Sequence, residues 1–105
     1  MRQFSVEGLV PAGADVTLDR LKAVLDGLDR AKPPAVLGEH SVSVRTRISF
    51  LSWGERVTCT LVPVEDGFWL RVESRSSVVT TLIDYGVNRR NVEQVARALE
   101  GFKGN

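Results

Sequence analysis

The segment 41–50 reads Ser-Val-Ser-Val-Arg-Thr-Arg-Ile-Ser-Phe, with its apolar residues and one threonine at every second position. This alternation predicts a half-buried β-strand, because successive side chains of a strand point to opposite faces of the sheet. The even-numbered residues would face a core, whereas Arg45 and Arg47 would face away from it. We therefore expect a sheet with one covered face and one open face.

Two later segments alternate in the same way. Their inward sets would be Val57, Cys59 and Leu61, then Phe68, Leu70 and Val72; their outward sets would be Arg56, Thr58, Thr60 and Val62, then Trp69, Arg71, Glu73 and Arg75. Apolar residues stay on one side of an antiparallel pair only if the hairpin loops have an even number of residues. A two-residue turn at Asp66-Gly67 predicts the pairs 61–72 and 64–69. An even loop centred on Trp53-Gly54 predicts the pairs 48–59 and 50–57.

Two weaker patterns complete the predicted sheet. Phe4 and Val6 alternate with polar residues in a short strand that Gly8 and the Pro-Ala-Gly segment 11–13 end. A further strand is expected at about 78–83, where the alternation leaves open which set of side chains points inward.

Helical periodicity appears on both sides of these strands. Leucines at three- and four-residue spacing predict an amphipathic helix over 18–28, with Asp15 or Thr17 as its N-cap. Apolar residues within 92–99 predict a second helix, for which Asn88 is the expected N-cap. The predicted order is β-α-β-β-β-β-α in a single α+β domain, 1–105, and both helices would cover the apolar face of an antiparallel meander sheet.

Two resemblances follow from these patterns. The element order resembles the TATA-binding-protein-like and helix-grip folds, in which a curved sheet wraps a C-terminal helix. Ser-Trp-Gly-Glu at 52–55, Glu-Ser-Arg-Ser at 73–76 and Asp-Tyr-Gly-Val-Asn-Arg-Arg-Asn-Val-Glu at 84–93 are similar to segments of uncharacterised bacterial domains of unknown function. The second resemblance covers roughly the C-terminal half and implies no activity.

Composition narrows the classes of partner. The 105 residues include 14 basic and 13 acidic side chains, so a net charge of +1 gives no whole-molecule attraction for nucleic acid or anionic membrane. No run of apolar residues approaches the ~20 of a membrane span, and the N-terminal residues lack the pattern of a signal peptide. One cysteine excludes an internal disulfide framework. We expect a cytoplasmic protein.

The chemistry-bearing residues do not form a recognisable catalytic set. The predicted register places Cys59 beside Ile48, about 26 Å along the strand from His40, so the two are not expected to act as nucleophile and base. With one histidine and one cysteine, no metal-ligand spacing is found. Glu65-Asp66 is interpreted as turn chemistry, and the glycines form no phosphate-binding loop. We expect no catalytic residues, no metal and no cofactor, and interpret the chain as non-enzymatic.

The open face is the best candidate for function. It would carry Arg45, Arg47, Trp69, Arg71, Glu73 and Arg75, which suits a protein partner or a homodimer. Solvation with cross-strand ion pairs is the competing interpretation of these residues. Nucleic acid is the least favoured partner, because the overall charge is nearly neutral and only one aromatic lies on the face.

The sequence offers two other candidate sites. Asn88, Arg89 and Arg90 form a possible anion site at a helix N-terminus, although a cap with solvated arginines explains the same residues. A small apolar ligand or lipid between the C-terminal helix and the sheet is the alternative function. Its lining would be Phe4, Ile48, Phe50, Phe68, Leu70, Leu99 and Phe102.

Overall fold

A computed structural model describes residues 3–11, 13, 16–28, 31–46, 54–76 and 87–99 of the chain. In chain order the elements are β1 (Gln3–Pro11), α1 (Leu18–Asp26), β2 (Ala35–Val36), β3 (Ser41–Arg45), β4 (Glu55–Val64), β5 (Gly67–Ser76) and α2 (Val87–Ala98). The predicted order β-α-β-β-β-β-α and the α+β class are therefore confirmed. The two-residue strand β2 was not predicted, and the strand expected at 78–83 lies outside the described residues.

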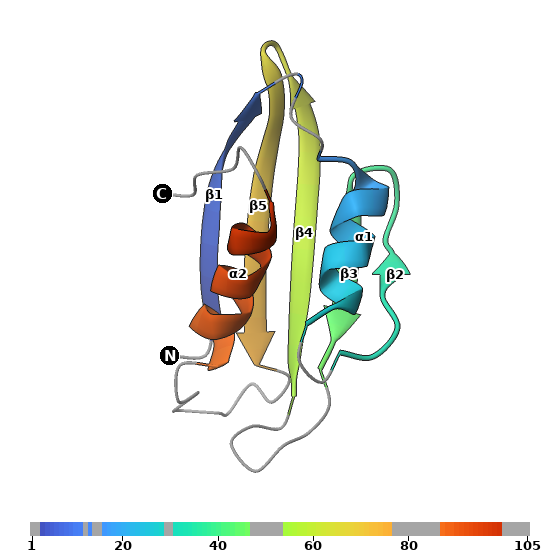
Figure 1. Cartoon of the computed structure of the whole chain (residues 1–105), viewed down its shortest axis with the longest axis vertical. Helices are drawn as coiled ribbons and strands as arrows, with labels where there is room; N and C mark the ends of the chain where they lie inside the picture. The colour runs from blue at the N-terminus through green and yellow to red at the C-terminus, as the bar shows by residue number, and fades with distance from the viewer. Residues whose placement is uncertain are drawn as a thin grey trace.

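The strands form one antiparallel sheet in the order β1-β5-β4-β3-β2. Consecutive strands β2 to β5 make an antiparallel meander, of which β3 to β5 were predicted, and β1 joins it beside β5. Both helices lie against the same face of the sheet (Figure 1). The other face is covered by neither helix, and we call it the open face.

Burial follows the predicted alternation. Most inward residues of β3, β4 and β5 are fully or almost fully buried together with the apolar stripes of both helices, whereas Phe4, Val6 and Phe68 are partly buried at the margin. This core includes Val10, Leu21, Leu25, Val42, Val44, Val57, Cys59, Leu61, Leu70, Val72, Val92 and Val95. Because each helix has one apolar stripe and the sheet has one apolar side, packing all three together removes most of this surface from water.

The hairpin between β4 and β5 differs from its prediction by two positions. Leu61 pairs with Leu70 and Val62 with Trp69, so the two turn residues are Glu65 and Asp66. Gly67 pairs with Val64 and has φ 149°, a conformation that favours glycine over residues with a Cβ. The predicted Asp66-Gly67 turn is therefore wrong. Gly67 does not belong to the two-residue turn but is the first residue of β5, where its positive φ is required.

The observed pairing of β3 with β4 differs from the predicted pairing by six positions. Val42 lies opposite Cys59 and Val44 opposite Val57, in place of Ile48 and Phe50. The connection between these strands therefore spans Thr46 to Glu55, which are themselves joined by a backbone hydrogen bond of 2.9 Å. Alternation fixes which face a residue takes but not the length of a loop.

The helices begin and end where local chemistry allows. Thr17 caps α1, since its side-chain oxygen accepts from the backbone N–H of Arg20 at 3.1 Å. In contrast, Asn88 is not the N-cap of α2: it is the second residue of that helix and fully buried. β1 is also longer than expected, since Gly8 continues the strand and pairs with Leu70. Within the described residues, neither helix is both long and apolar enough to cross a membrane.

Candidate functional site

The open face is organised in rows that run across the strands. One residue of β1, β5, β4 and, where it extends far enough, β3 stands in each row, because antiparallel partners lie directly opposite one another. The pairings align Leu9-Trp69-Val62 in one row, Glu7-Arg71-Thr60-Ser41 in the next, then Ser5-Glu73-Thr58-Ser43, and finally Gln3-Arg75-Arg56-Arg45. The face therefore changes from apolar at the β4–β5 turn to basic at the other end.

Leu9, Trp69 and Val62, with Val64 further along β4, form what we call the apolar row. Their exposed fractions are 45, 42, 41 and 43%. Each is high for a large apolar side chain, and three of the four are aligned on adjacent strands. An apolar surface of this kind, bordered by charge, is typical of interaction sites.

The centre of the face is occupied by ion pairs around Glu73. Arg71 Nη2 lies 2.9 Å from Glu73 Oε2, and Arg75 Nε lies 3.7 Å from Glu73 Oε1. Arg71 Nε is also 4.0 Å from Glu7 Oε2. Thr58 and Thr60 complete a shallow depression of about 400 Å³ between these charged side chains. Exposed pairs of this kind are worth about 0–1 kcal/mol each.

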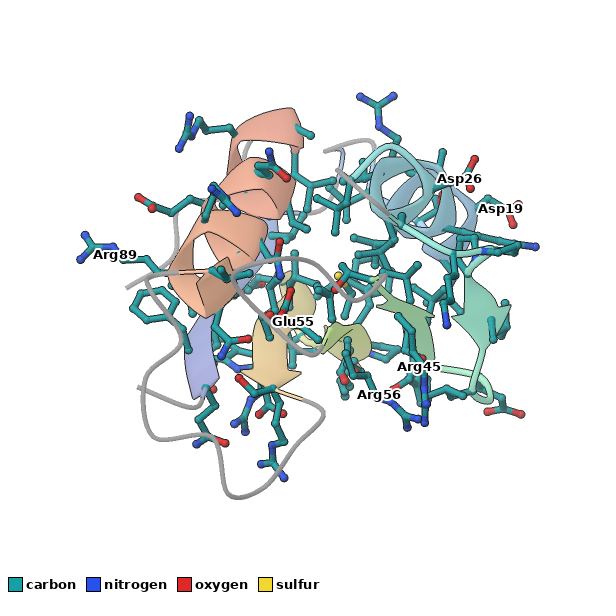
Figure 2. The ribbon with its side chains drawn as sticks, turned by 90° about the horizontal axis from the view of Figure 1, so that it is seen from below. Asp19, Asp26, Arg45, Glu55, Arg56 and Arg89 are labelled. Atoms are coloured by element: carbon teal, nitrogen blue, oxygen red, sulfur yellow. The ribbon has the colours of Figure 1, made fainter. Side chains whose placement is uncertain are left out.

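The basic end consists of Arg45, Arg56 and Arg75, which we call the arginine row. Arg45 is opposite Arg56, and Arg56 is opposite Arg75. Figure 2 shows Arg45 and Arg56 side by side on the side of the sheet turned away from the helices. Three like charges are thus carried at one level of three adjacent strands.

The predicted members of this face lie on it, but their neighbours differ. Arg45, Trp69, Arg71, Glu73 and Arg75 share the open face, whereas Arg47 lies outside the described residues. Arg45 was expected beside Val62 and Arg71, and it is beside Arg56 instead.

Two members of the rows were missed as site residues. Arg56 was assigned to this face from the alternation, but the wrong register hid its position between two arginines. Leu9 was missed because the strand was expected to end at Gly8. The alternation of Val6, Gly8 and Val10 with Glu7 and Leu9 was the available signal.

A second polar group lies on the covered face. Glu55 is fully buried (Figure 2), and its Oε1 accepts from Thr46 Oγ1 at 2.9 Å and from Asn91 Nδ2 at 3.3 Å. The backbone N–H of Glu55 donates to Thr46 Oγ1 at 2.8 Å. Oε2 of Glu55 is buried without a hydrogen-bond partner. Ser74 and Asn88 extend this group, which we call the Glu55 cluster.

Hydrogen bonds link the Glu55 cluster to α2. Asn91 Nδ2 also donates to Ser74 Oγ at 3.1 Å, and Ser74 Oγ donates to Asn88 Oδ1 at 2.7 Å. Asn88 Nδ2 donates to Ser76 Oγ at 3.0 Å. The cluster therefore ties the ends of β4 and β5 to the first turns of the helix. Sequence reasoning missed it, because Asn88 was assigned to capping and Asn91 was given no role.

The proposed anion site is divided between interior and surface. The Asn88 amide is engaged inside the protein, as described above. Arg89 lies with its guanidinium 5.7 Å from the centre of the Phe4 ring and its Nε 3.6 Å from Glu93 Oε1. Arg90 is exposed. The structure therefore separates Asn88 from the two arginines.

The predicted separation of Cys59 and His40 is wrong, since Cys59 pairs with Val42 and the Leu61 N–H donates to the His40 carbonyl at 2.7 Å. The two side chains nevertheless differ in environment. Cys59 is fully buried, and burial raises the pKa of its thiol to about 12. A thiol protonated at neutral pH is a poor nucleophile. His40 is exposed, with Nε2 4.0 Å from Glu39.

The residues expected to line an apolar ligand site belong in part to the core. Leu70 and Leu99 are buried in the main cluster, with Phe4 and Phe68 packed at its margin. Ile48, Phe50 and Phe102 lie outside the described residues. A groove of about 500 Å³ runs on the outside between α1 and α2, lined by residues that include Ala23, Gly27 and Ala98.

Among the residues that the structure describes, no three His, Cys, Asp or Glu side chains are grouped so that they could hold a metal ion. Comparisons with protein-family models and with curated proteins found no match for this chain. The geometry of the open face is therefore the main guide to function.

Proposed function

We propose that this protein is a non-enzymatic interaction module that binds another protein on the open face of its sheet. The observation that carries the proposal is the apolar row, in which Leu9, Trp69 and Val62 are aligned and each more than 40% exposed. Burying such a row would contribute about 25 cal/mol for each Å² of apolar surface removed from water. Trp and Arg are also the residues most enriched among those that dominate binding energy.

The shape of the surface suits a protein partner better than a small ligand. The row lies on adjacent strands of a sheet, and the depression next to it is shallow and polar. Small-molecule sites are concave and mostly apolar, and they enclose most of the ligand. A partner that covers several strands at once would instead use the row as the centre of a broader contact.

The test is to select binders without assuming their identity. Random 12-residue peptides displayed on phage are panned on the biotinylated protein, and the selected peptides are synthesised and titrated into ¹⁵N-labelled protein. We expect amide shifts on the outward residues of β1, β4 and β5. Trp69→Ala should reduce affinity at least tenfold, whereas Leu37→Ala, a control at another exposed apolar position, should leave it within twofold.

Light scattering on size-exclusion fractions of the same variants examines self-association. A dimer that dissociates with Trp69→Ala and persists with Leu37→Ala would identify a second copy as the occupant of the face. Selected peptides that map to the helical side and ignore Trp69→Ala would refute the proposed site.

A further inference from the structure

The arginine row holds more positive charge than the described residues around it neutralise. Neighbouring strands are about 4.8 Å apart, so three backbone positions bearing arginine fall within about 10 Å. Like charges directly opposite each other destabilise a sheet. In the part of the chain that the structure describes, Arg75 shares Glu73, but neither the Arg45 nor the Arg56 guanidinium has an acidic partner.

A second copy of this chain, packed symmetrically through the same open face, would not supply an unpaired acid. A two-fold axis parallel to the strands would place one arginine row on the other. An axis across the strands would place the row opposite the apolar row or a middle row of the other copy, or beyond the contact, depending on the level at which the axis passes. In each case the acidic residues of the face, Glu7 and Glu73, remain in the middle rows and already face Arg71 or Arg75.

A nucleic-acid strand also fits poorly. Binding of single strands combines positive charge with aromatic platforms on which bases stack. Trp69 is six positions from Arg75 along β5, which is about 20 Å in a strand. The path between them crosses Glu73, whose carboxylate would repel phosphates. The acidic groups of a peptide can instead be confined to one end, where the arginines are.

We propose that the open face recognises a partner segment with two features: an acidic cluster that binds the arginine row, and an apolar residue about 20 Å away that binds the apolar row. In an extended segment this distance corresponds to about six residues. The inference rests on the proposed function and specifies the chemistry of the partner. Carboxylates match the planar fork of a guanidinium with two parallel hydrogen bonds.

The acidic half is tested with hexaglutamate as the probe and ¹H-¹⁵N spectra that include the arginine Nε–H signals. At low salt we expect shifts concentrated on Arg45, Arg56 and Arg75. The double variant Arg45→Gln/Arg56→Gln should weaken binding at least tenfold. Arg20→Gln, an exposed control on α1, should change it less than twofold. The double variant removes repulsion in the sheet and Arg20 is exposed, so loss of folding does not compromise the comparison.

Hexathymidylate is titrated in parallel. If it shifts the arginine row and hexaglutamate does not, the row serves nucleic acid and the proposal is overturned. It is also overturned if hexaglutamate shifts the Arg20 region as strongly as the row, or if the double variant binds unchanged. A dimer through the open face, as detected by light scattering, would overturn the choice of a separate partner.

The selected peptides separate this inference from the proposed function. Peptides that depend on Trp69 but carry no acidic residues, and that bind the double arginine variant normally, would support an interaction module and refute the acidic partner. Peptides that combine an apolar residue with acidic residues about six positions away, and that lose affinity in both Trp69→Ala and the double variant, would support both.

Discussion

Replacing the central arginine of the row should make the protein more stable. Arg56 stands between Arg45 and Arg75 on adjacent strands and has no acidic partner among the described residues. Like charges directly opposite in a sheet are destabilising, and we take the cost of each pair to equal in size the roughly 0.2–1 kcal/mol that a favourable cross-strand pair contributes. Arg56→Gln relieves two such pairs and keeps most of the aliphatic stem. We expect a gain of about 0.5–1 kcal/mol in the free energy of unfolding at low salt.

The matched control is an arginine of the same face that is well paired. Arg71→Gln loses the 2.9 Å contact with Glu73 and the 4.0 Å contact with Glu7, and its exposed ion pairs are worth about 0–1 kcal/mol each. This variant should therefore be neutral or less stable than wild type. The two substitutions are chemically identical, so an opposite sign isolates the effect of neighbouring charge.

Urea unfolding at 10 mM and 1 M NaCl measures both effects. With a slope of about 1–3 kcal/mol per M, the Arg56→Gln midpoint should rise by roughly 0.2–1 M at low salt. At 1 M salt the screening length falls to about 3 Å, and most of the gain should disappear. An unchanged or lower midpoint at low salt would refute the reasoning, and so would a gain of equal size at both salt concentrations.

Three further predictions concern the covered face. Thr46→Val should lower the free energy of unfolding by about 2–4 kcal/mol, because it removes a buried hydroxyl that bonds both the carboxylate and the N–H of Glu55. The control Thr58→Val, on the open face, should change the free energy of unfolding by less than about 0.5 kcal/mol in the same urea assay. Cys59 should react with a thiol reagent at pH 8 only at the rate of unfolding, and rapid labelling under native conditions would contradict its burial. Thermal scans should show stability falling between about pH 9 and 12, because the unfolded chain releases the thiol proton at a lower pH than the folded chain. Leu70→Ala should cost about 2–5 kcal/mol by leaving a cavity in the core, and calorimetry showing a loss below 1 kcal/mol would contradict the packing described.

The alternation of residues predicted the fold class and the membership of the open face, but not the neighbours within it. Both register errors were even, two positions for β4–β5 and six for β3–β4, so each side chain kept its face. This is why Trp69 and Arg71 were correctly assigned to the open face. It is also why the alignment of Arg45 with Arg56 could not be predicted from alternation alone.

Long-range hydrogen bonds account for the β3–β4 error. Trp53-Gly54 was an acceptable centre for an even loop, and local propensity alone could not exclude it. The observed pairing instead joins Thr46 to Glu55 and places a glutamate on the apolar side. An inward glutamate is acceptable there because Asn91, which is distant in the sequence, donates to it. Such a contact has no signature in a period-two pattern.

The Glu55 cluster and the arginine row occupy the same ends of the same strands. Thr46 follows Arg45, Glu55 precedes Arg56, and Ser74 and Ser76 flank Arg75. Because adjacent residues of a strand face opposite sides, each strand contributes a polar residue to the buried cluster and an arginine to the open face. The bonds of Thr46 with Glu55 and of Asn91 with Glu55 and Ser74 hold the three strands in register.

Holding that register also holds the arginines opposite one another. The ion pairs of Glu73 account for Arg71 and Arg75 as ordinary surface charges, but within the described ranges no carboxylate pairs with Arg45 or Arg56. A shift of β3 by two positions that places Ser43 opposite Arg56 would keep the apolar residues inward and move Arg45 away from Arg56, so hydrophobic burial alone does not require the row. The buried polar cluster selects the pairing in which the like charges are aligned. We infer that this alignment serves a partner that brings carboxylates, because no acidic side chain among the described residues compensates Arg45 or Arg56.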